Sequence, residues 1–377
     1  VDQLLKAAEL VEAGNPYSAR EILARLNHQL PPSPIGLKPL LRTAFLFKEV
    51  LLHLANHNQN PCCSPPPRPP QQSNPWDVVL KLSSYKLFSE VSPLLHFANF
   101  TCTQTLLEEI GNFDRIHIVD FDIGVGGQWS SFIQELAHRR SPSVPFLKIT
   151  AFVSPSSSSF HPLVLHLVSD NLSQFAAELR IPFEFTALAF ESFNPNDLLL
   201  AVSPNEAIAV NLPIGSHYPQ SFPTLLKLVK QLNPKVVVSI DQGCDRSDLP
   251  FPQYFLHSFQ ACMILLDSLD AAGTNADVAN KIERMLVQPR LESLVVGHGH
   301  GHGHGHHRAA GGKMPSWRAL FGTVGFVPVQ FTNFTETQAE CLLKRVQVRG
   351  FHVDKRQGSL VLYWQRGELG SVSAWRC

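Results

Sequence analysis

The amino-acid sequence predicts an α/β protein in which an N-terminal helical cap precedes a mostly parallel β-sheet. Apolar residues recur at helical spacing over roughly the first 110 residues, which favours a helical segment. From Arg115 onward the chain changes to short β-rich runs separated by helix-length stretches, a pattern typical of βαβ units. With 377 residues and 44% hydrophobic content, the chain is long and apolar enough to bury a large core.

Start and stop signals divide the helical cap, residues 1–110, into several helices. Asp2 is an N-cap candidate for the first helix, and the Gly-Asn-Pro sequence at 14–16 is expected to end it. The following helices are predicted from a capping box at residues 18–21, over 40–57 and over 76–110. A proline-rich stretch at 61–75 precedes the last of these and is predicted to be a loop.

The α/β core is predicted over residues 111–377. Its strands are expected at residues 115–121, 145–152, 182–188, 206–212, 235–241, 326–331 and 359–365. The last run follows the sequence FHVDK and a polar turn, which favours an antiparallel edge. Five parallel strands with an antiparallel end resemble the Rossmann-like sheet plan of S-adenosylmethionine methyltransferases.

Charge and cysteine content exclude several classes of protein. Lys plus Arg equals Asp plus Glu, so there is no global attraction to nucleic acid or membrane, and any such contact needs a local patch. The seven cysteines lack CxxC spacing, which favours reduced thiols over disulfides or a zinc site. We find neither an apolar stretch of membrane-spanning length nor a signal peptide. The chain begins at Val1 without methionine, so we expect it to be part of a longer protein.

A histidine and glycine tract, GHGHGHGHGHH, occupies residues 297–307. Dense histidine could ligate a transition metal, but alternating glycine provides no preformed geometry for selective binding. We therefore expect a flexible low-complexity insertion and no metal site.

The sequence DIGVGG follows the first predicted strand and places Gly124, Gly126 and Gly127 before a helix. Such a loop lets the backbone approach an anionic ligand, so these glycines are the only candidates for cofactor contacts. A methyltransferase would also need an acid after the second strand, where this chain has AFVSPSSSS. The fourth strand ends in NLPI, which lacks the aromatic residue that grips a flipped base. We therefore expect neither a cofactor nor a catalytic residue, and interpret Asp120, Asp122 and Asp241 as loop and helix caps.

Several motifs in order resemble the GRAS domain of plant transcriptional regulators over nearly the whole chain. The VHIID motif of that family matches Ile116, His117, Ile118, Val119 and Asp120, and its SAW motif matches Ser373, Ala374 and Trp375. The PFYRE region of that family matches the sequence KIERMLVQPRLES, in which Glu283, Arg284 and Arg290 are the charged residues that correspond to the motif. The resemblance implies a single domain over 1–377, with leucine repeat I in the cap, VHIID at about 85–150, leucine repeat II at about 163–200, PFYRE at about 206–296 and SAW at about 308–377.

The same resemblance implies a function in transcription. It implies a helical cap and a methyltransferase-like core without established methyltransferase activity, a nuclear location, and homeodomain or other GRAS proteins as partners, with a homodimer as a further expectation. The sequence ERMLVQPRLES is most similar to the Hairy-meristem branch of scarecrow-like proteins, which implies meristem gene control. Two alternatives stay open: an S-adenosylmethionine-dependent methyltransferase, and a co-regulator that does not bind DNA.

Two surfaces are candidates for macromolecular contacts. The apolar positions that could serve a partner helix are Leu4, Leu5, Val11, Ile22, Leu23 and Leu26, although most such positions are expected to pack in the protein's own core. The candidates for phosphate contacts in DNA are Lys344, Arg345, Arg349, Lys355, Arg356 and Arg366, opposed by Asp354, with Arg139 and Arg140 as a second group. An ordinary solvated face is the alternative explanation for these charges.

Overall fold

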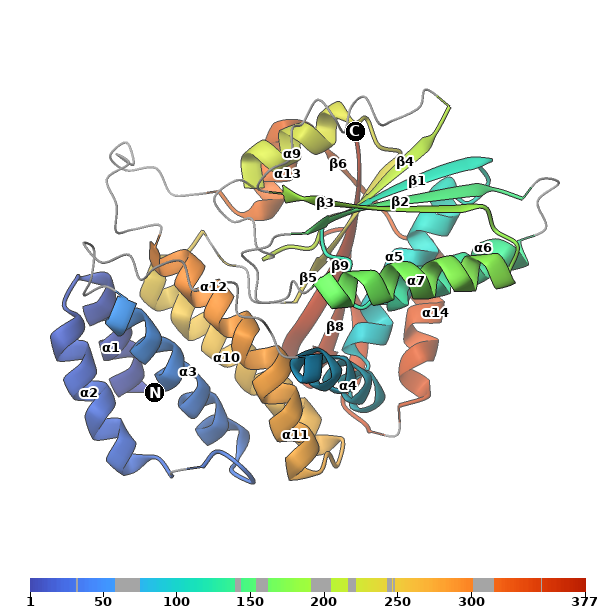
Figure 1. Cartoon of the computed structure of the whole chain (residues 1–377). Coiled ribbons are helices and arrows are strands. Elements are labelled where there is room, and N and C mark those ends of the chain that lie inside the picture. The colour runs from blue at the N-terminus through green and yellow to red at the C-terminus, as the bar shows by residue number, and fades with distance from the viewer. Residues whose placement is uncertain are drawn as a thin grey trace. The chain divides into compact units, whose positions relative to one another are not determined.

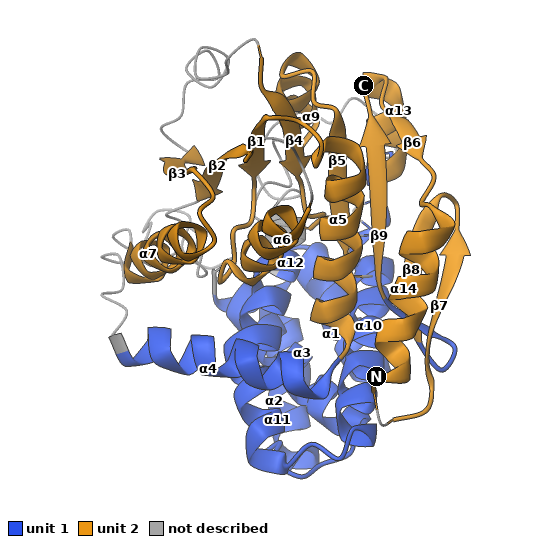
Figure 2. Cartoon of the chain, turned by 90° about the vertical axis from the view of Figure 1, so that its right-hand side faces the viewer, with its two compact units in different colours: residues 1–92, 243–317, 364–369 blue, residues 93–242, 318–363, 370–377 orange. Residues whose placement is uncertain are grey.

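The structure is a computed structural model, and it describes residues 1–31, 33–57, 75–139, 144–153, 162–190, 205–215, 222–242, 246, 248–300, 315–346 and 348–377 (Figure 1). The chain divides into two compact units, which Figure 2 shows in different colours. Unit 1 comprises Val1–Ser92, Gly243–Trp317 and Trp364–Leu369, and unit 2 comprises Pro93–Gln242, Arg318–Tyr363 and Gly370–Cys377.

Unit 1 is helical. Its helices are α1 (Asp2–Glu12), α2 (Pro16–Gln29), α3 (Pro39–His57), α4 (Pro75–Val91), α10 (Phe251–Ala271), α11 (Ala276–Ile282), the π-helix η2 (Glu283–Val287) and α12 (Gln288–His300). Helix α3 packs against α10, and the fully buried Phe47 ring lies 5.0 Å from that of Phe255 and 5.2 Å from that of Phe259. Edge-to-face aromatic packing of this kind adds to the free energy gained by burial and fixes the two helices against each other.

The first helices begin at positions that differ from those predicted. Helix α1 has Val1 as its N-cap, so Asp2 is its first helical residue rather than a cap. Helix α2 begins at Pro16, and the side chain of Asn15 accepts a hydrogen bond from the Ser18 N–H. The predicted capping box at Ser18 was therefore wrong. Proline fits the first helical turn because its fixed φ is already helical and no N–H is needed there.

Unit 2 is built on the β-sheet. The strands of the sheet are β1 (Arg115–Asp120), β2 (Phe146–Val153), β3 (Phe183–Ala189), β4 (Ala207–Asn211), β5 (Val236–Asp241), β6 (Val327–Val329), β7 (Phe351–Arg356), β8 (Ser359–Trp364) and β9 (Gly367–Arg376). The end of β8 and the start of β9, Trp364–Leu369, are counted with unit 1. The sheet order is β3-β2-β1-β4-β5-β9-β8-β7, and β6 also pairs with β9. Strands β1 to β5 are parallel and β9 is antiparallel to β5, which confirms the predicted α/β class with an antiparallel end.

Helices cover both faces of this sheet. They are α5 (Leu94–Ile110), α6 (Gly127–His138), α7 (Pro162–Glu178), α9 (Phe222–Gln231), α13 (Trp317–Val324) and α14 (Asn333–Lys344). Helices α5, α6, α7 and α14 lie on one side of the sheet, and α9 and α13 lie on the other (Figures 1 and 2). Strands β1, β4 and β5 are therefore buried on both faces, which explains their nearly continuous apolar sequences.

Some predicted segments differ from the structure or lie outside the described residues. The helical region predicted over 76–110 is two helices, α4 and α5, because Pro93 has no N–H to continue the first. Leucine repeat II contains α7 and β3, and its residues 191–200 are outside the described part. Helix α12 extends into the histidine and glycine tract as far as His300, and residues 301–307 are not described.

Candidate functional site

The carboxylate of Asp120, at the end of β1, holds together three segments of unit 2. Asp120 is fully buried, and its Oδ1 accepts hydrogen bonds from the Asp122 N–H at 2.9 Å and from Asn211 Nδ2 at 2.8 Å. Its Oδ2 accepts a bond from Trp129 Nε1 at 2.6 Å. Parallel pairing of β1 with β4 sets Asp120 directly beside Asn211, which explains the link between residues 91 positions apart.

The environment of Asp120 favours its protonated form more than water would. Burial, aided by the nearby Asp122 carboxylate, raises the pKa of Asp120 to about 7 although the three hydrogen bonds lower it. The buried thiol of Cys102 lies in the same surroundings, and burial followed by the Asp120 charge raises its pKa as well. Such a thiol is not a reactive nucleophile.

The glycines after β1 form a turn that closely approaches α7. Gly124 has φ +54° and Gly126 has φ +76°, which are left-handed conformations that favour glycine. A Cβ added at Gly126 would lie 3.0 Å from Val168 Cγ1, whereas additions at Gly124 and Gly127 would meet open space. Gly126 is therefore explained by the turn and by helix packing, without a ligand.

The fold implies S-adenosylmethionine as a cofactor, but the residues around this loop do not fit it. Both oxygens of Asp120 are already bonded to protein donors. Near the end of β2, where a ribose-binding acid is needed, the buried Phe152 ring stacks on that of Phe121 at 4.8 Å. Two buried amide atoms, Asn211 Oδ1 and Gln128 Nε2, have no hydrogen-bond partner among the described residues, but neutral amides do not replace the missing acid. The absence of a cofactor stays a prediction.

The VHIID residues are part of the core of unit 2. Ile116, Ile118 and Val119 are fully buried, and so is His117. The imidazole of His117 lies 2.9 Å from Thr150 Oγ1 through Nε2 and 3.2 Å from Glu206 Oε2 through Nδ1. Burial lowers the pKa of His117, against the opposing charge of Glu206. His117 is thus held between β2 and the start of β4 as a buried structural histidine.

The SAW residues lie on β9 between β5 and β6. Trp375 is 5% exposed, its ring stacks on Phe321 with centroids 4.5 Å apart, and its Nε1 donates to Ser373 Oγ at 3.0 Å. In the sheet, Trp375 pairs with Val237 of β5 and Ala374 with Val238. The motif therefore joins the C-terminal strand to the parallel part of the sheet.

The basic residues near the C-terminus are exposed on α14 and β7 of unit 2, but they are not as unopposed as the sequence indicated. Lys344 and Arg345 lie at the end of α14, and Arg349, Lys355 and Arg356 follow. The carboxylate of Glu336 on α14 forms an ion pair with Lys355. This acid comes from a neighbouring helix, so it was missed when charges were counted along the chain.

The remaining basic candidates are Arg366, Arg139 and Arg140. Arg366 belongs to unit 1, and Arg140 lies outside the described residues. Arg139 follows α6, and its guanidinium lies over Gly111 at the end of α5, where an added Cβ would be 2.5 Å from Nη1. Its Nη1 donates to Asn112 Oδ1 at 3.5 Å. A cation at a helix C-terminus stabilises the helix dipole, which accounts for Arg139 without DNA.

Most of the leucine positions considered for a partner helix are core residues of unit 1. Leu4, Val11, Leu23 and Leu26 are buried, because α1 and α2 pack against each other and both contact α3. The remaining two, Leu5 and Ile22, are only partly exposed. Periodicity identified the apolar face correctly but not the helices that cover it.

A different apolar face, on α4, is exposed and was missed in the sequence. Trp76 is 70% exposed, Val79 53% and Leu80 45%, and these residues lie at i, i+3 and i+4 on one side of the helix. We call them the α4 face. The i, i+3, i+4 spacing was visible in the sequence, but only the structure shows that these three side chains are exposed among the described residues. Exposed apolar residues in such a group are typical of protein interaction sites.

The described residues contain neither a membrane-spanning helix nor a metal-binding cluster. Among the described helices, none is long and apolar enough to cross a membrane. Within the same ranges, no group of three or more His, Cys, Asp or Glu side chains is placed to hold a metal ion.

Comparisons of the sequence and of the structure with known proteins point to the same protein family. Residues 1–376 match the GRAS domain family. Scarecrow-like proteins 6 and 27 of Arabidopsis thaliana are 46% and 45% identical to the whole chain, and the matches cover 62% and 58% of those proteins. The crystal structure of SCL7 in Oryza sativa is similar with a TM-score of 0.74 and 27% identity, covering 100% of this chain and 99% of that one. The chain thus spans about three fifths of the curated relatives it matches.

Proposed function

The chain belongs to the GRAS domain family, and on that premise we propose that it is a transcriptional regulator in the plant cell nucleus. The observation that carries the proposal is the family match over residues 1–376. Similarity to Scarecrow-like proteins over the whole chain supports a role in development, and we propose meristem gene control as that role. The domain acts in this proposal as a binding module.

Protein contacts are the first proposed means of action. The α4 face supports this, because Trp76 is 70% exposed and carries Val79 and Leu80 on the same side of the helix. A helix with anchors at i, i+3 and i+4 can enter an apolar groove of another protein, and tryptophan is enriched among residues that dominate binding energy. We propose a homeodomain protein or another GRAS domain as the partner.

DNA contact is the second proposed means of action. Lys344, Arg345 and Arg349 are exposed cations within a short stretch after α14, as expected for residues that bind phosphate. The test is fluorescence anisotropy of labelled duplex DNA with the domain, at salt concentrations from about 50 to 200 mM. Reversing all three charges to glutamate should flatten the slope of log affinity against log salt by about 2.7, since each phosphate contact contributes roughly 0.9. Arg25→Glu, at an exposed position of α2 in unit 1, is the matched control.

A co-regulator that does not contact DNA is the alternative that one observation favours. Glu336 neutralises Lys355, and Glu340 adds a further exposed acid on α14, so the net positive charge of this surface is small. If neither the wild type nor the triple reversal binds DNA, the protein acts through partners alone. If both bind DNA equally, residues other than these three cations contact the phosphates. A methyltransferase requires S-adenosylmethionine binding, and calorimetric titration of the domain with that compound tests it directly.

A further inference from the structure

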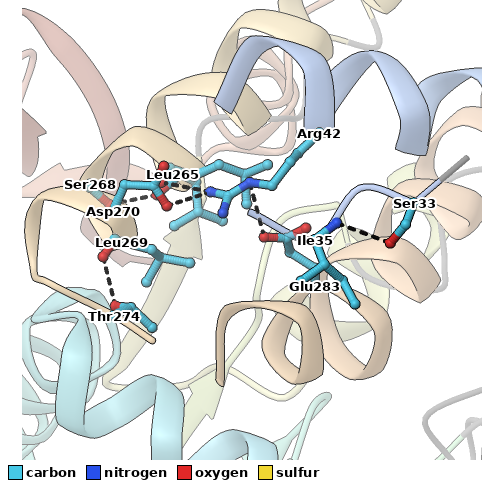
Figure 3. A network of polar contacts seen from close by, with 10 residues as sticks. Ser33, Ile35, Arg42, Leu265, Ser268, Leu269, Asp270, Thr274 and Glu283 are labelled. Carbon is cyan, nitrogen blue, oxygen red and sulfur yellow. Dashed lines mark hydrogen bonds and ion pairs between the residues drawn. The ribbon is translucent and has the colours of Figure 1, made fainter. Parts of the chain in front are cut away.

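One buried arginine in unit 1 is shared by two carboxylates that come from different helical segments (Figure 3). Arg42 of α3 is 4% exposed, and its Nη2 donates to Asp270 Oδ1 of α10 at 2.6 Å. The same nitrogen also donates to the Leu266 carbonyl oxygen at 3.4 Å. On its other side, Arg42 Nε lies 3.4 Å from Glu283 Oε1, at the first residue of the π-helix η2.

The two carboxylates differ in how well they are stabilised. The side chain of Asp270 is 34% exposed, so water reaches it in addition to Arg42. The side chain of Glu283 is 3% exposed, and neither its Oε1 nor Arg42 Nε has a hydrogen-bond partner within the described residues. The accessible carboxylate of Asp270 therefore has the short hydrogen bond to Arg42, whereas the buried carboxylate of Glu283 has a longer ion pair with it. A buried charge is costly unless it is both paired and hydrogen-bonded.

We propose that Glu283 binds a proton in the folded protein, so that Arg42, Asp270 and Glu283 form a proton-dependent clasp between α3, α10 and η2. With the proton bound, the positive charge of Arg42 is balanced by Asp270 alone. When the proton leaves, a second negative charge is buried beside the same guanidinium. Its desolvation costs more than the long ion pair with Arg42 returns, so the folded state of this segment loses stability. Burial raises the pKa of Glu283 to about 7, with Asp270 adding to the shift and Arg42 opposing it.

Other charged groups lie on the elements packed against η2 and belong in the design of the test. They are Asp77, Lys81, Lys86 and Glu90 on α4, Asp277 and Lys281 on α11, and Arg290 and Glu292 on α12. Glu292 accepts a hydrogen bond from Gln288 Nε2 at 3.0 Å, so it is a carboxylate near η2 that has a donor of its own. Glu292→Gln is therefore the matched control for Glu283→Gln.

The direction of the pH effect follows from the shift. The pKa of Glu283 is higher in the folded protein, about 7, than its ordinary value of 4.5. Between these values the folded state holds a proton that the unfolded state has lost, so the contribution of this group to the unfolding free energy falls as pH rises. The segment that loosens first is α11 with η2, residues 276–287, because Glu283 joins it to Arg42.

The experiment measures urea unfolding of the whole chain from about pH 5 to about pH 8, with hydrogen exchange of residues 276–287 in parallel. Glu283→Gln should remove close to one proton from the uptake on folding and make exchange in this segment independent of pH after correction for intrinsic rates. Asp270→Asn should move the pH window downward, because Glu283 then becomes the only carboxylate beside Arg42. Glu292→Gln should behave as the wild type.

Three results would overturn the proposal. One is an unchanged pH dependence in Glu283→Gln, and another is an unmoved window in Asp270→Asn. The third is an infrared difference spectrum between pH 6 and 8, on either side of the pKa of about 7, without loss of a protonated-carboxyl band. It is recorded in Asp120→Asn, because burial raises the pKa of Asp120 to about 7 as well. This spectrum and Asp270→Asn decide the question even if Glu283→Gln does not fold.

Discussion

Replacing Trp375 by alanine is expected to lower the unfolding free energy of unit 2 by about 3–5 kcal/mol, the range for a buried aromatic side chain. The ring is 5% exposed and stacks on Phe321 at 4.5 Å, so its removal leaves a cavity between β9 and α13. It also removes the hydrogen bond from Nε1 to Ser373 Oγ at 3.0 Å, a loss of about 1 kcal/mol that falls within this range.

The assay is urea unfolding followed by far-ultraviolet circular dichroism, because a signal from tryptophan fluorescence would itself change with the substitution. Trp76→Ala is the matched control, since Trp76 is 70% exposed and its replacement should change the unfolding free energy by less than about 0.5 kcal/mol. A midpoint for Trp375→Ala as close to the wild type as that of Trp76→Ala would refute the reasoning. Loss of partner binding at unchanged stability would then make Trp375 an interface residue.

Three further predictions test the other features. Trp76→Ala combined with Val79→Ala should weaken association with a purified second GRAS domain at least about tenfold in calorimetry, and unchanged affinity would exclude the α4 face. Asp120→Asn should flatten the fall in unfolding free energy between about pH 4 and pH 7, because burial raises the pKa of Asp120 to about 7 and the folded state holds that proton; an unchanged slope contradicts this. Gly367→Ala should destabilise unit 1 by about 1–3 kcal/mol in urea unfolding, because the new Cβ would lie 2.6 Å from Ile264 Cδ1. Adding Ile264→Ala should restore part of that loss, and a further loss equal to Ile264→Ala alone would show that the two side chains do not clash.

The parallel strands could be predicted to within one residue at each end. Runs such as RIHIVD and VVVSID are β-branched and apolar, and parallel strands covered on both faces require such runs. Strand β9 was not predicted, because GELGSVSAWR contains two glycines, a glutamate and an alanine, residue types that are depleted in strands. Its burial comes from pairing with β5, a contact between residues more than a hundred positions apart that local sequence does not encode.

The sequence predicted the glycine-containing loop after β1, but it did not predict the hydrogen bonds that converge on Asp120. The sequence placed Asp120 at a strand end before glycines, yet it could not show that Trp129 and Asn211 donate to the same carboxylate. In the same way, the pair between Lys355 and Glu336 depends on how α14 lies beside β7, and charges counted along the chain do not report it. Sequence patterns therefore do not predict which polar side chains from distant parts of the chain come into contact.

The hydrogen bonds of Asp120 bear on where this domain can act. A ligand that used this carboxylate would first have to displace Trp129 Nε1 or Asn211 Nδ2, leaving a buried donor unpaired at a cost of about 1–3 kcal/mol each. Gly126 also has a structural role, since its turn is packed against Val168. Asp120 and Gly126, which suggested a cofactor site, thus hold the start of α6 against the sheet. We therefore propose that binding takes place at exposed surfaces, and the α4 face and the cations Lys344, Arg345 and Arg349 are our two candidates.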